Sequence, residues 1–277
     1  MDVMNTDSSA LAPTLPSDRE RRFGGISRLY GAPALAVFEA AHVAVIGIGG
    51  VGSWAAEALA RSAIGTLTLI DLDHVGQSNT NRQIHALDGQ YGKPKVTAMA
   101  ERIRLINAAC KIQLVEDFVE PENLDAILGG GFDYVIDAID SVRAKTALIA
   151  WCVKHEQALV TTGGAGGQLD PTRIRITDLA CTIQDPLLSK VRAQLRKQHG
   201  FPRGPKAKFK VSAVYSDEPL IYPVDAACDI DEVQHMPNAG MAGLNCAGFG
   251  SSVCVTASFG LTAAAHVLHA LAKTANR

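Results

Sequence analysis

The sequence has few aromatic residues and no excess of either charge. Of its 277 residues only 5% are aromatic, and 26 basic side chains are balanced by 28 acidic ones. The formal net charge of −2 excludes a globally basic nucleic-acid-binding protein, although a local basic patch is compatible with it. Hydrophobic residues make up 47% of the chain, enough for a sizeable core, and this excludes a disordered protein.

Paired cysteines and a hydrophobic leader are also missing. The six cysteines include no Cys-x-x-Cys pair, which argues against a zinc ribbon. Residues 1–18 read as a loose, disordered polar tail rather than a signal peptide, so we expect a cytoplasmic protein with reduced thiols. Cys246 lies in a glycine-containing loop, and we expect it to be non-catalytic because the proposed chemistry below needs no thiol.

One long segment lacks charge altogether. No Lys, Arg, Asp or Glu occurs at positions 251–272, a length that could cross a bilayer. The segment is rich in Ala and contains two histidines and several hydroxyl residues, which make it a poor membrane span. We therefore predict a buried helix or the interface helix of a homodimer, with membrane contact as the less favoured alternative.

Short apolar runs alternate with helix-length segments in the first half, as is typical of parallel βαβ units. We predict an α/β fold: a Rossmann-like, mostly parallel sheet with helices on both faces, followed by a mixed portion with antiparallel strands. The whole of 19–277 is predicted to be one domain, with a nucleotide-binding half at about 40–165 and a basic insert at about 185–210. The predicted strands are 42–47, 66–71, 112–116, 134–137, 158–161, 173–177 and 211–215, and the predicted helices are 51–61, 95–107, 122–128 and 142–155.

A glycine-rich turn follows the first predicted strand and opens a helix. The turn contains Gly47, Gly49, Gly50 and Gly52, and the next strand ends at Asp71. Glycines let the backbone approach a phosphate, the helix N-terminus points free N–H groups at it, and the carboxylate is placed for ribose hydroxyls. By itself this unit fits an NAD-binding Rossmann domain as well as an ATP-binding one.

The charges that follow favour ATP. An adenylating enzyme must stabilise charge at an α-phosphate while pyrophosphate leaves, which requires cations and a carboxylate for Mg²⁺. Arg82 and Lys95 supply the cations. Asp140 and Ser141 follow a third strand, and strand ends of an open α/β sheet meet in one crevice.

In order and spacing these motifs resemble those of the ubiquitin-activating-enzyme-like (HesA/MoeB/ThiF) superfamily of ATP-dependent adenylating proteins. The resemblance implies that the glycine turn and Asp71 hold adenosine and phosphates, and that Arg82 and Lys95 hold the polyphosphate. It also implies that Asn81 orients Arg82 and that Asp140 coordinates Mg²⁺; K⁺ or Na⁺ is a further candidate cofactor. The motifs that carry the resemblance are Gly47–Gly52, Asp71-x-Asp73, Asn81-Arg82-Gln83, Lys95 and Asp140.

Within the superfamily, the chain from about Arg22 to Ala272 resembles the tRNA-modifying branch. That branch implies ATP-dependent dehydration (cyclisation) of threonylcarbamoyladenosine beside the anticodon, through adenylation of the threonyl carboxylate. The implied partner is tRNA, and a cysteine desulfurase or its sulfur acceptor is a further candidate. The segments that match are Arg22-Phe-Gly-Gly, Arg28-Leu-Tyr-Gly, 79–86, 137–143, 160–168 and 182–186.

Two other functions remain open at this point. Adenylation of a small sulfur-carrier protein is one, and the members that do this usually carry two zinc-binding cysteine pairs, which are absent here. A nucleotide-binding scaffold for sulfur transfer is the other, and it would tolerate loss of Arg82 or Asp140. The sulfur-carrier members also have a second arginine, three residues after the first, that acts on the ATP of the partner subunit. In this chain Gly25 occupies the position of that arginine. Arg22 or Arg28 is therefore the candidate for the catalytic role across the dimer.

A run of basic residues without Asp or Glu lies at positions 190–210. Such a run in a slightly acidic protein is typical of a local phosphate-binding surface, although a solvated helix face with a basic loop has the same composition. Together with the resemblance, we predict RNA binding here. The residues are Lys190, Arg192, Arg196, Lys197, Arg203, Lys206, Lys208 and Lys210.

Overall fold

The computed structural model describes residues 18–204, 206–222 and 249–275. Within these residues one sheet has the strand order β3-β2-β1-β4-β5-β7-β6. All neighbouring strands are parallel except β6 and β7, which are antiparallel. The strands are β1 (His42–Ile46), β2 (Thr66–Ile70), β3 (Lys111–Val115), β4 (Tyr134–Asp137), β5 (Leu159–Thr162), β6 (Ile174–Asp178) and β7 (Ser212–Ser216).

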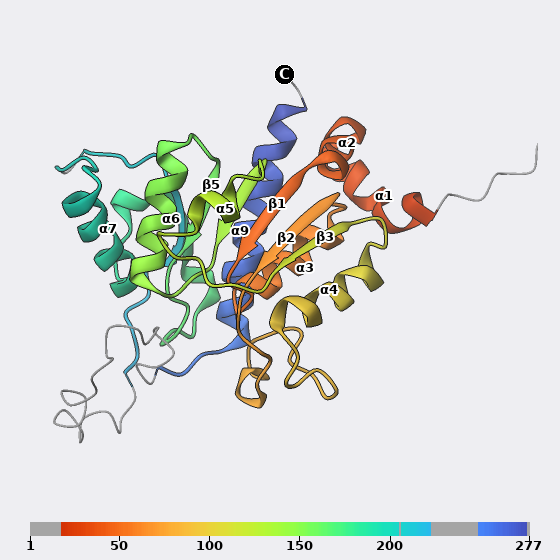
Figure 1. Ribbon diagram of the computed structural model, residues 1–277, viewed down its shortest axis with the longest axis horizontal. Coiled ribbons are helices and arrows are strands. Elements are labelled where there is room, and N and C mark those ends of the chain that lie inside the picture. The colour runs from red at the N-terminus through yellow and green to blue at the C-terminus, as the bar shows by residue number, and fades with distance from the viewer. Residues whose placement is uncertain (1–17, 205, 223–248, 276–277) are drawn as a thin grey trace, which may run out of the picture.

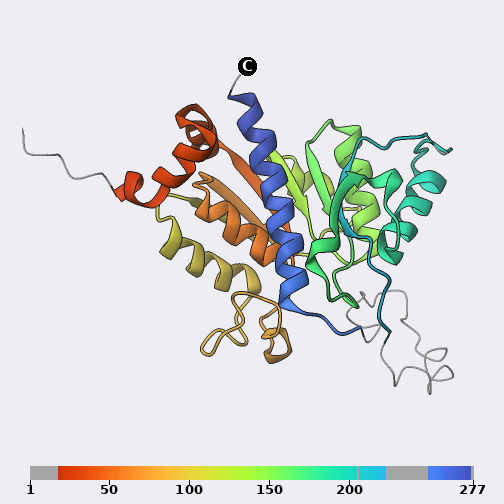
Figure 2. The same cartoon turned by 180° about the vertical axis from the view of Figure 1, so that it is seen from behind.

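Helices cover both faces of the sheet (Figures 1 and 2). Alternate residues of β1 point into two separate cores: Val43 and Val45 pack with α2, α3, α4 and α9, whereas Ala44 and Ile46 pack with α5, α6 and α7. This two-sided burial explains why the central strand β1 is a nearly continuous apolar run. The helices are α1 (Asp18–Tyr30), α2 (Ala32–Ala40), α3 (Gly52–Arg61), α4 (Lys95–Ile106), α5 (Leu124–Leu128), α6 (Val142–Lys154), α7 (Pro186–Gln198) and α9 (Val253–Thr274).

The predicted fold class is confirmed, and the predicted elements agree with the observed ones to within about two residues. The helices α1 and α2, which precede the first strand, were not predicted; α1 is highly charged, with only Phe23 buried. The prediction of a tail over 1–18 lies outside the described residues except for Asp18, which is the first residue of α1. The second half is also less antiparallel than expected, because β7 pairs in parallel with β5.

The long uncharged segment forms α9, which lies across one face of the sheet (Figure 2). By length and composition α9 could cross a membrane, but core helices of soluble proteins pass the same test. Its buried face includes Val255, Phe259 and Val267, all fully buried in the core shared with α2 and α3. One face of α9 is therefore buried, which agrees with the first of the two predicted alternatives, a buried helix or an interface helix. Because this face packs within its own chain, the segment's apolar character no longer argues for a dimer.

The crossing of α9 over α3 depends on Gly260. A Cβ added at Gly260 would lie 2.2 Å from the carbonyl oxygen of Val51 and 2.9 Å from the amide nitrogen of Ala55. Both atoms belong to backbone, so neither can move aside without shifting a helix. The first turn of α3 and the middle of α9 are therefore in backbone-to-backbone contact.

We expect Gly260→Ala to lower the free energy of unfolding by about 1–3 kcal/mol, the usual cost of overpacking. Gly25→Ala is the matched control, because Gly25 is also helical but its added Cβ would meet only the flexible Arg28 side chain at 4.0 Å. That control should be neutral or slightly stabilising, since Ala favours a helix over Gly. Denaturant unfolding of both variants checks this, and equal effects would contradict the account of the crossing.

Candidate active site

A cavity of about 540 Å³ opens at the carboxyl ends of the parallel strands. It lies where the strand order reverses, between β1 and β4, which is where open α/β sheets bind ligands. The prediction that the motifs meet in one crevice is confirmed for most of them. The predicted residues that line the cavity are Gly47, Gly49, Gly50, Asp71, Asp73, Arg82, Lys95, Asp140 and Ser141.

The glycine turn gives the cavity a wall of bare backbone. Gly47 has φ +85°, and a Cβ there would lie 2.8 Å from the carbonyl oxygen of Ala138. At Gly52 a Cβ would lie 1.8 Å from the carbonyl oxygen of Gly47, so Gly52 closes the turn without lining the cavity. Gly49, by contrast, has only the Gln83 amide at 4.0 Å. This leaves room beside the backbone for a phosphate at the start of α3, as the sequence predicts.

The Asp71 carboxylate is held at the end of β2 by backbone donors. It accepts hydrogen bonds from the amides of Ile48 (2.6 Å) and Asp73 (2.8 Å). Burial raises the pKa of Asp71, while Lys95 and the two backbone donors oppose that shift. Each carboxylate oxygen retains a lone pair, so the group can still accept from the hydroxyls of a ribose.

Arg82 is half-buried and fixed from three sides. Its Nη1 donates to the carbonyl of Ser78 and to Oδ1 of Asn81, both at 2.9 Å, and Trp54 donates to its backbone carbonyl at 2.9 Å. Burial lowers the pKa of Arg82, and the nearby carboxylate of Asp140 opposes the shift. The predicted role of Asn81 in orienting Arg82 agrees with this geometry; Asn81 itself does not line the cavity.

The second cation, Lys95, is 7% exposed at the start of α4. Its Nζ lies 2.6 Å from Oδ2 of Asp73, so this predicted pair of site residues forms an ion pair at the cavity wall. Both cations thus enter the cavity already oriented. Such preorganised groups stabilise developing charge with little reorganisation.

A fully buried ion pair lies beneath the Asp140 loop. Lys145 Nζ is 2.7 Å from Oδ2 of Asp137, and neither side chain is exposed. Thr161 Oγ1 donates to the same carboxylate at 2.7 Å, and the amide of Ile139 donates to it at 3.1 Å. The pair therefore ties β4, β5 and α6 to the loop that presents Asp140.

The cavity also contains residues that sequence reasoning did not assign. Gln83 and Thr256 are 5% and 4% exposed, and each has a side-chain oxygen without a hydrogen-bond partner. Such unpaired polar atoms are costly in a protein interior unless a ligand or water satisfies them. Gln83 belongs to the Asn81-Arg82-Gln83 motif and the glycines after β5 belong to the matching segment 160–168, whereas no sequence motif contains Thr256. The other unassigned lining residues include Asn79, Phe118, Val119, Arg143, Thr162, Gly163, Gly164 and Ser251.

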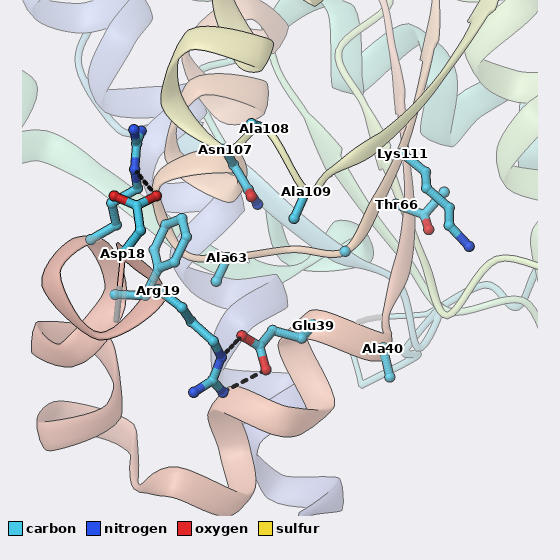
Figure 3. A pocket seen from close by; sticks show the side chains of 13 residues that line it. Asp18, Arg19, Glu39, Ala40, Ala63, Thr66, Asn107, Ala108, Ala109 and Lys111 are labelled. Atoms are coloured by element: carbon cyan, nitrogen blue, oxygen red, sulfur yellow. Dashed lines mark hydrogen bonds and ion pairs between the residues drawn. The ribbon is translucent and has the colours of Figure 1, made fainter. Parts of the chain in front are cut away.

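Arg22 and Arg28 do not reach the cavity of their own chain. Arg22 pairs with Asp18 at 2.9 Å and donates to the carbonyl of Ile106 at 3.1 Å. It borders a second cavity of about 530 Å³ near the amino ends of β1, β2 and β3, whose lining includes an Arg19–Glu39 ion pair (Figure 3). The prediction that either arginine serves a partner subunit stays a prediction.

The basic run lies on α7 and the loop after it, and α7 begins beside the cavity, which Leu187 lines. Arg192 donates to Thr182, and the guanidinium of Arg196 lies 5.1 Å from the centre of the Phe209 ring. These two are half-buried and engaged within the protein. Phe209 is buried as well, which favours packing over base stacking. The exposed members are Lys190, Lys197, Arg203, Lys206, Lys208 and Lys210.

The donor set suits a magnesium–nucleotide complex better than a resident metal. Among the described residues no three His, Cys, Asp or Glu side chains form a metal cluster. Asp140 is an exposed single carboxylate at the cavity, near Arg82. Mg²⁺ typically takes one or two carboxylates together with phosphate oxygens and water, so Asp140 fits that role. Cys246 lies outside the described residues, and Cys110, Cys152, Cys181 and Cys254 are free thiols.

Known proteins resemble the chain over most of its length. A family model described as the ThiF family matches residues 25–277. The tRNA threonylcarbamoyladenosine dehydratase of Escherichia coli K12 is 52% identical over 260 residues, which cover 93% of this chain and 96% of that protein. The molybdopterin-synthase adenylyltransferase of the same organism is 33% identical over 120 residues, or 43% of this chain and 48% of that protein.

The same fold is found in solved structures. Crystal structures of the E. coli tRNA N6-threonylcarbamoyladenosine dehydratase in complex with ATP and with AMP each superpose with a TM-score of 0.83. In both, sequence identity is 50%, and the match covers 95% of this chain and 99% of the other. That relative therefore binds the nucleotides whose chemistry the cavity fits.

The buried His85, two residues after Gln83, generates a prediction about pH. It is 2% exposed, and neither ring nitrogen has a hydrogen-bond partner. Burial, with smaller contributions from Lys95 and Arg102, lowers its pKa to about 4. Because an unfolded histidine has a pKa near 6.5, the unfolded state binds more protons between pH 6.5 and 4, and stability falls as the pH falls through that range.

We expect His85→Gln to remove this part of the pH dependence. Between pH 7 and 4.5 the unmodified protein should lose about 2 kcal/mol more unfolding free energy than the variant. Urea unfolding at several pH values measures the difference. His199→Gln, at an exposed histidine, controls for the general effect of removing an imidazole. Parallel curves for unmodified protein and His85→Gln would contradict the interpretation.

Proposed function

We infer the function of this protein from the premise that the chain belongs to the ThiF family. It catalyses the ATP-dependent dehydration (cyclisation) of threonylcarbamoyladenosine beside the anticodon of tRNA. The observation that carries this conclusion is 52% identity to the E. coli dehydratase over 93% of the chain. The cavity supports it, since it combines a phosphate-binding turn, a ribose-binding carboxylate and two oriented cations.

The reaction begins with a poor electrophile. The threonyl carboxylate of the modified nucleoside resists attack in water, so one of its oxygens attacks the α-phosphate of ATP. A carboxylate–phosphorus bond forms while the bond from that phosphorus to the pyrophosphate oxygen breaks. The neighbouring carbamoyl group then closes a ring on the activated carbonyl, and AMP leaves with the carboxylate oxygen. Proximity makes the second step effectively unimolecular. The nucleoside loses one water, and ATP becomes AMP and pyrophosphate.

The residues of the cavity supply position and charge for this chemistry. The backbone of the glycine turn holds the α-phosphate at the start of α3, and Asp71 holds the ribose. Arg82 and Lys95 stabilise the negative charge of the departing pyrophosphate. Asp140 would hold Mg²⁺, which supplies further positive charge to the polyphosphate when bound. A K⁺ or Na⁺ site stays a prediction without assigned residues.

The substrate side is proposed to lie along α7. The exposed lysines of the basic run would bind phosphates of the anticodon arm, while Asp185 joins that surface to the cavity. This buried carboxylate accepts from the amides of Leu188, in the first turn of α7, and Gly164, in the cavity wall. We accordingly propose that the enzyme is located in the cytoplasm, where its tRNA substrate is found. A cysteine desulfurase or its sulfur acceptor remains a predicted partner.

Adenylation of a sulfur-carrier protein is the less favoured function. Its E. coli relative is less similar and matches less than half of this chain. The described residues also contain no group of metal-ligating cysteines. A nucleotide-binding scaffold is disfavoured as well, because Arg82 and Asp140 are both present and both lie at the cavity.

The products test the proposed function. Incubation with ATP and tRNA that carries threonylcarbamoyladenosine should yield AMP, pyrophosphate and a nucleoside lighter by one water. Mass spectrometry and nucleotide chromatography measure both. Release of pyrophosphate with a sulfur-carrier protein but not with tRNA would favour the alternative, and formation of ADP or a requirement for NAD would contradict the chemistry.

Arg82→Ala should reduce turnover about 100-fold or more at saturating ATP, because it removes a preorganised cation from a reacting phosphate. Arg61→Ala is the matched control, since Arg61 is exposed away from the cavity lining and its partner, the buried Glu57, is also paired with Arg102. The control should retain near-normal rates. Near-normal turnover in Arg82→Ala would remove Arg82 from the mechanism.

We further propose a homodimer that uses the face of α1 carrying Arg22. Leu29 lies two helical turns after Arg22, on the same face, and is 75% exposed. Leu105, whose carbonyl accepts from Arg22, is 82% exposed. Light scattering at micromolar concentration should give about twice the chain mass of 29.3 kDa. A monomeric mass would contradict the dimer and with it the role of Arg22 or Arg28 across it.

A further inference from the structure

The first turns of α9 carry a buried hydroxyl group with no hydrogen-bond partner. Thr256 is 4% exposed, and its Oγ1 is unpaired. Hydroxyl residues inside helices can donate to a carbonyl one turn back. Ser258 of the same helix does so at 2.7 Å, and Thr146 of α6 does so at 2.6 Å. Thr256 therefore keeps a donor that its own helix does not use.

This hydroxyl group belongs to a residue of the nucleotide cavity. Thr256 lines the cavity together with the glycine turn and Arg82. A Cβ added at Gly50 would lie 3.1 Å from the Arg82 side chain and 3.4 Å from the Cβ of Thr256. The arginine and the threonine thus approach the same point of the turn, from loop and helix respectively.

The dipole of α9 adds a positive potential at the cavity, which favours negatively charged phosphates. α9 has 22 residues and begins at the cavity, where Ser251 is a lining residue. The hydroxyl of the N-cap residue Ser252 accepts from the backbone amide of Cys254, and the carbonyl of Ser252 accepts from the backbone amide of Thr256. Because these amides are already paired, the turn contributes its positive dipole end rather than free N–H groups. α3 also begins at this cavity, so two helix N-termini meet there.

A further hydrogen bond couples this turn to the cation. Asn81 donates from Nδ2 to the carbonyl of Ser251 at 2.9 Å and accepts from Arg82 Nη1 at 2.9 Å. The start of α9 and the guanidinium are therefore held by the two ends of one carboxamide. The close crossing at Gly260 fixes the rest of α9 against α3.

We propose that the start of α9 is a second phosphate-binding element, in which Thr256 Oγ1 donates to the polyphosphate of ATP on the Arg82 side of the cavity. The identity of the ligand rests on the proposed function; the placement rests on the unpaired buried hydroxyl and on the approach of the Thr256 Cβ to Gly50, beside the Arg82 side chain. The helix near the C-terminal end of the chain then stabilises the same leaving charge as the turn after β1.

The test compares ATP with AMP, which lacks the two outer phosphates. Calorimetry with Thr256→Val should show ATP binding weakened about tenfold, the effect of losing one hydrogen bond to a charged group. AMP binding should change less than about twofold, because the α-phosphate rests on the glycine turn. Thr256→Ser, which keeps the hydroxyl, should bind both nucleotides almost normally. Thr262→Val is the matched control on the same helix, since Thr262 does not line the cavity.

Two results would overturn the inference: unchanged ATP affinity in Thr256→Val, or an equal loss for ATP and AMP. Valine matches threonine in shape, and thermal unfolding checks that the variant is folded. If Thr256→Val does not fold, competition of inorganic pyrophosphate with ATP is measured in Thr256→Ala. Pyrophosphate should compete more weakly in this variant than in the unmodified protein, and equal competition would contradict the inference. The two proposals can fail separately. If the protein cyclises the tRNA nucleoside but Thr256→Val binds ATP normally, the proposed function holds and the role of Thr256 is wrong. If Thr256→Val weakens ATP binding but the protein does not act on tRNA, the role of Thr256 holds and the proposed function is wrong.

Discussion

Backbone packed directly on backbone around the glycine turn is the constraint on which the site depends. A side chain at Gly47, Gly52 or Gly260 would place its Cβ 2.8, 1.8 or 2.2 Å from a carbonyl oxygen. These contacts bring β1, β4, α3 and α9 together at one point of the sheet. Because main-chain atoms form the wall, the cavity holds its shape without depending on rotamers, and the charged side chains around it are presented from a rigid frame.

The charges at the cavity are arranged so that few are left without a partner. Lys95 is paired with Asp73, Arg82 is held by Asn81, and Asp137 beneath them is paired with Lys145 in full burial. A buried pair of this kind gives little net stability, because desolvation offsets most of the Coulomb attraction. Its value lies in geometry: it holds the loop of Asp140 in place, as preorganised transition-state stabilisation requires.

The main features of the nucleotide site could be predicted because they are local in sequence. Strand, glycine turn and helix follow one another, and the charged motif residues stand at strand ends, in the loops that follow them or at the start of a helix. The roles of Asp185, Thr256 and the Asp137–Lys145 pair were not predicted, although both aspartates stand within segments that carry the family resemblance. Their contacts arise from the packing of separate elements: Lys145 is buried between α6, β4 and β5, and Thr256 of α9 meets the glycine turn.

The sequence by itself determined the parallel α/β architecture, the glycine turn and most of the charged residues that line the cavity, since periodicity and motif spacing are properties of contiguous segments. Only the tertiary structure decided that the uncharged C-terminal segment is a core helix, that Arg192 and Arg196 are engaged within the protein, and that Arg22 lies away from the cavity of its own chain. Burial and partner choice depend on which distant segments pack together, and that information appears only when the chain is folded.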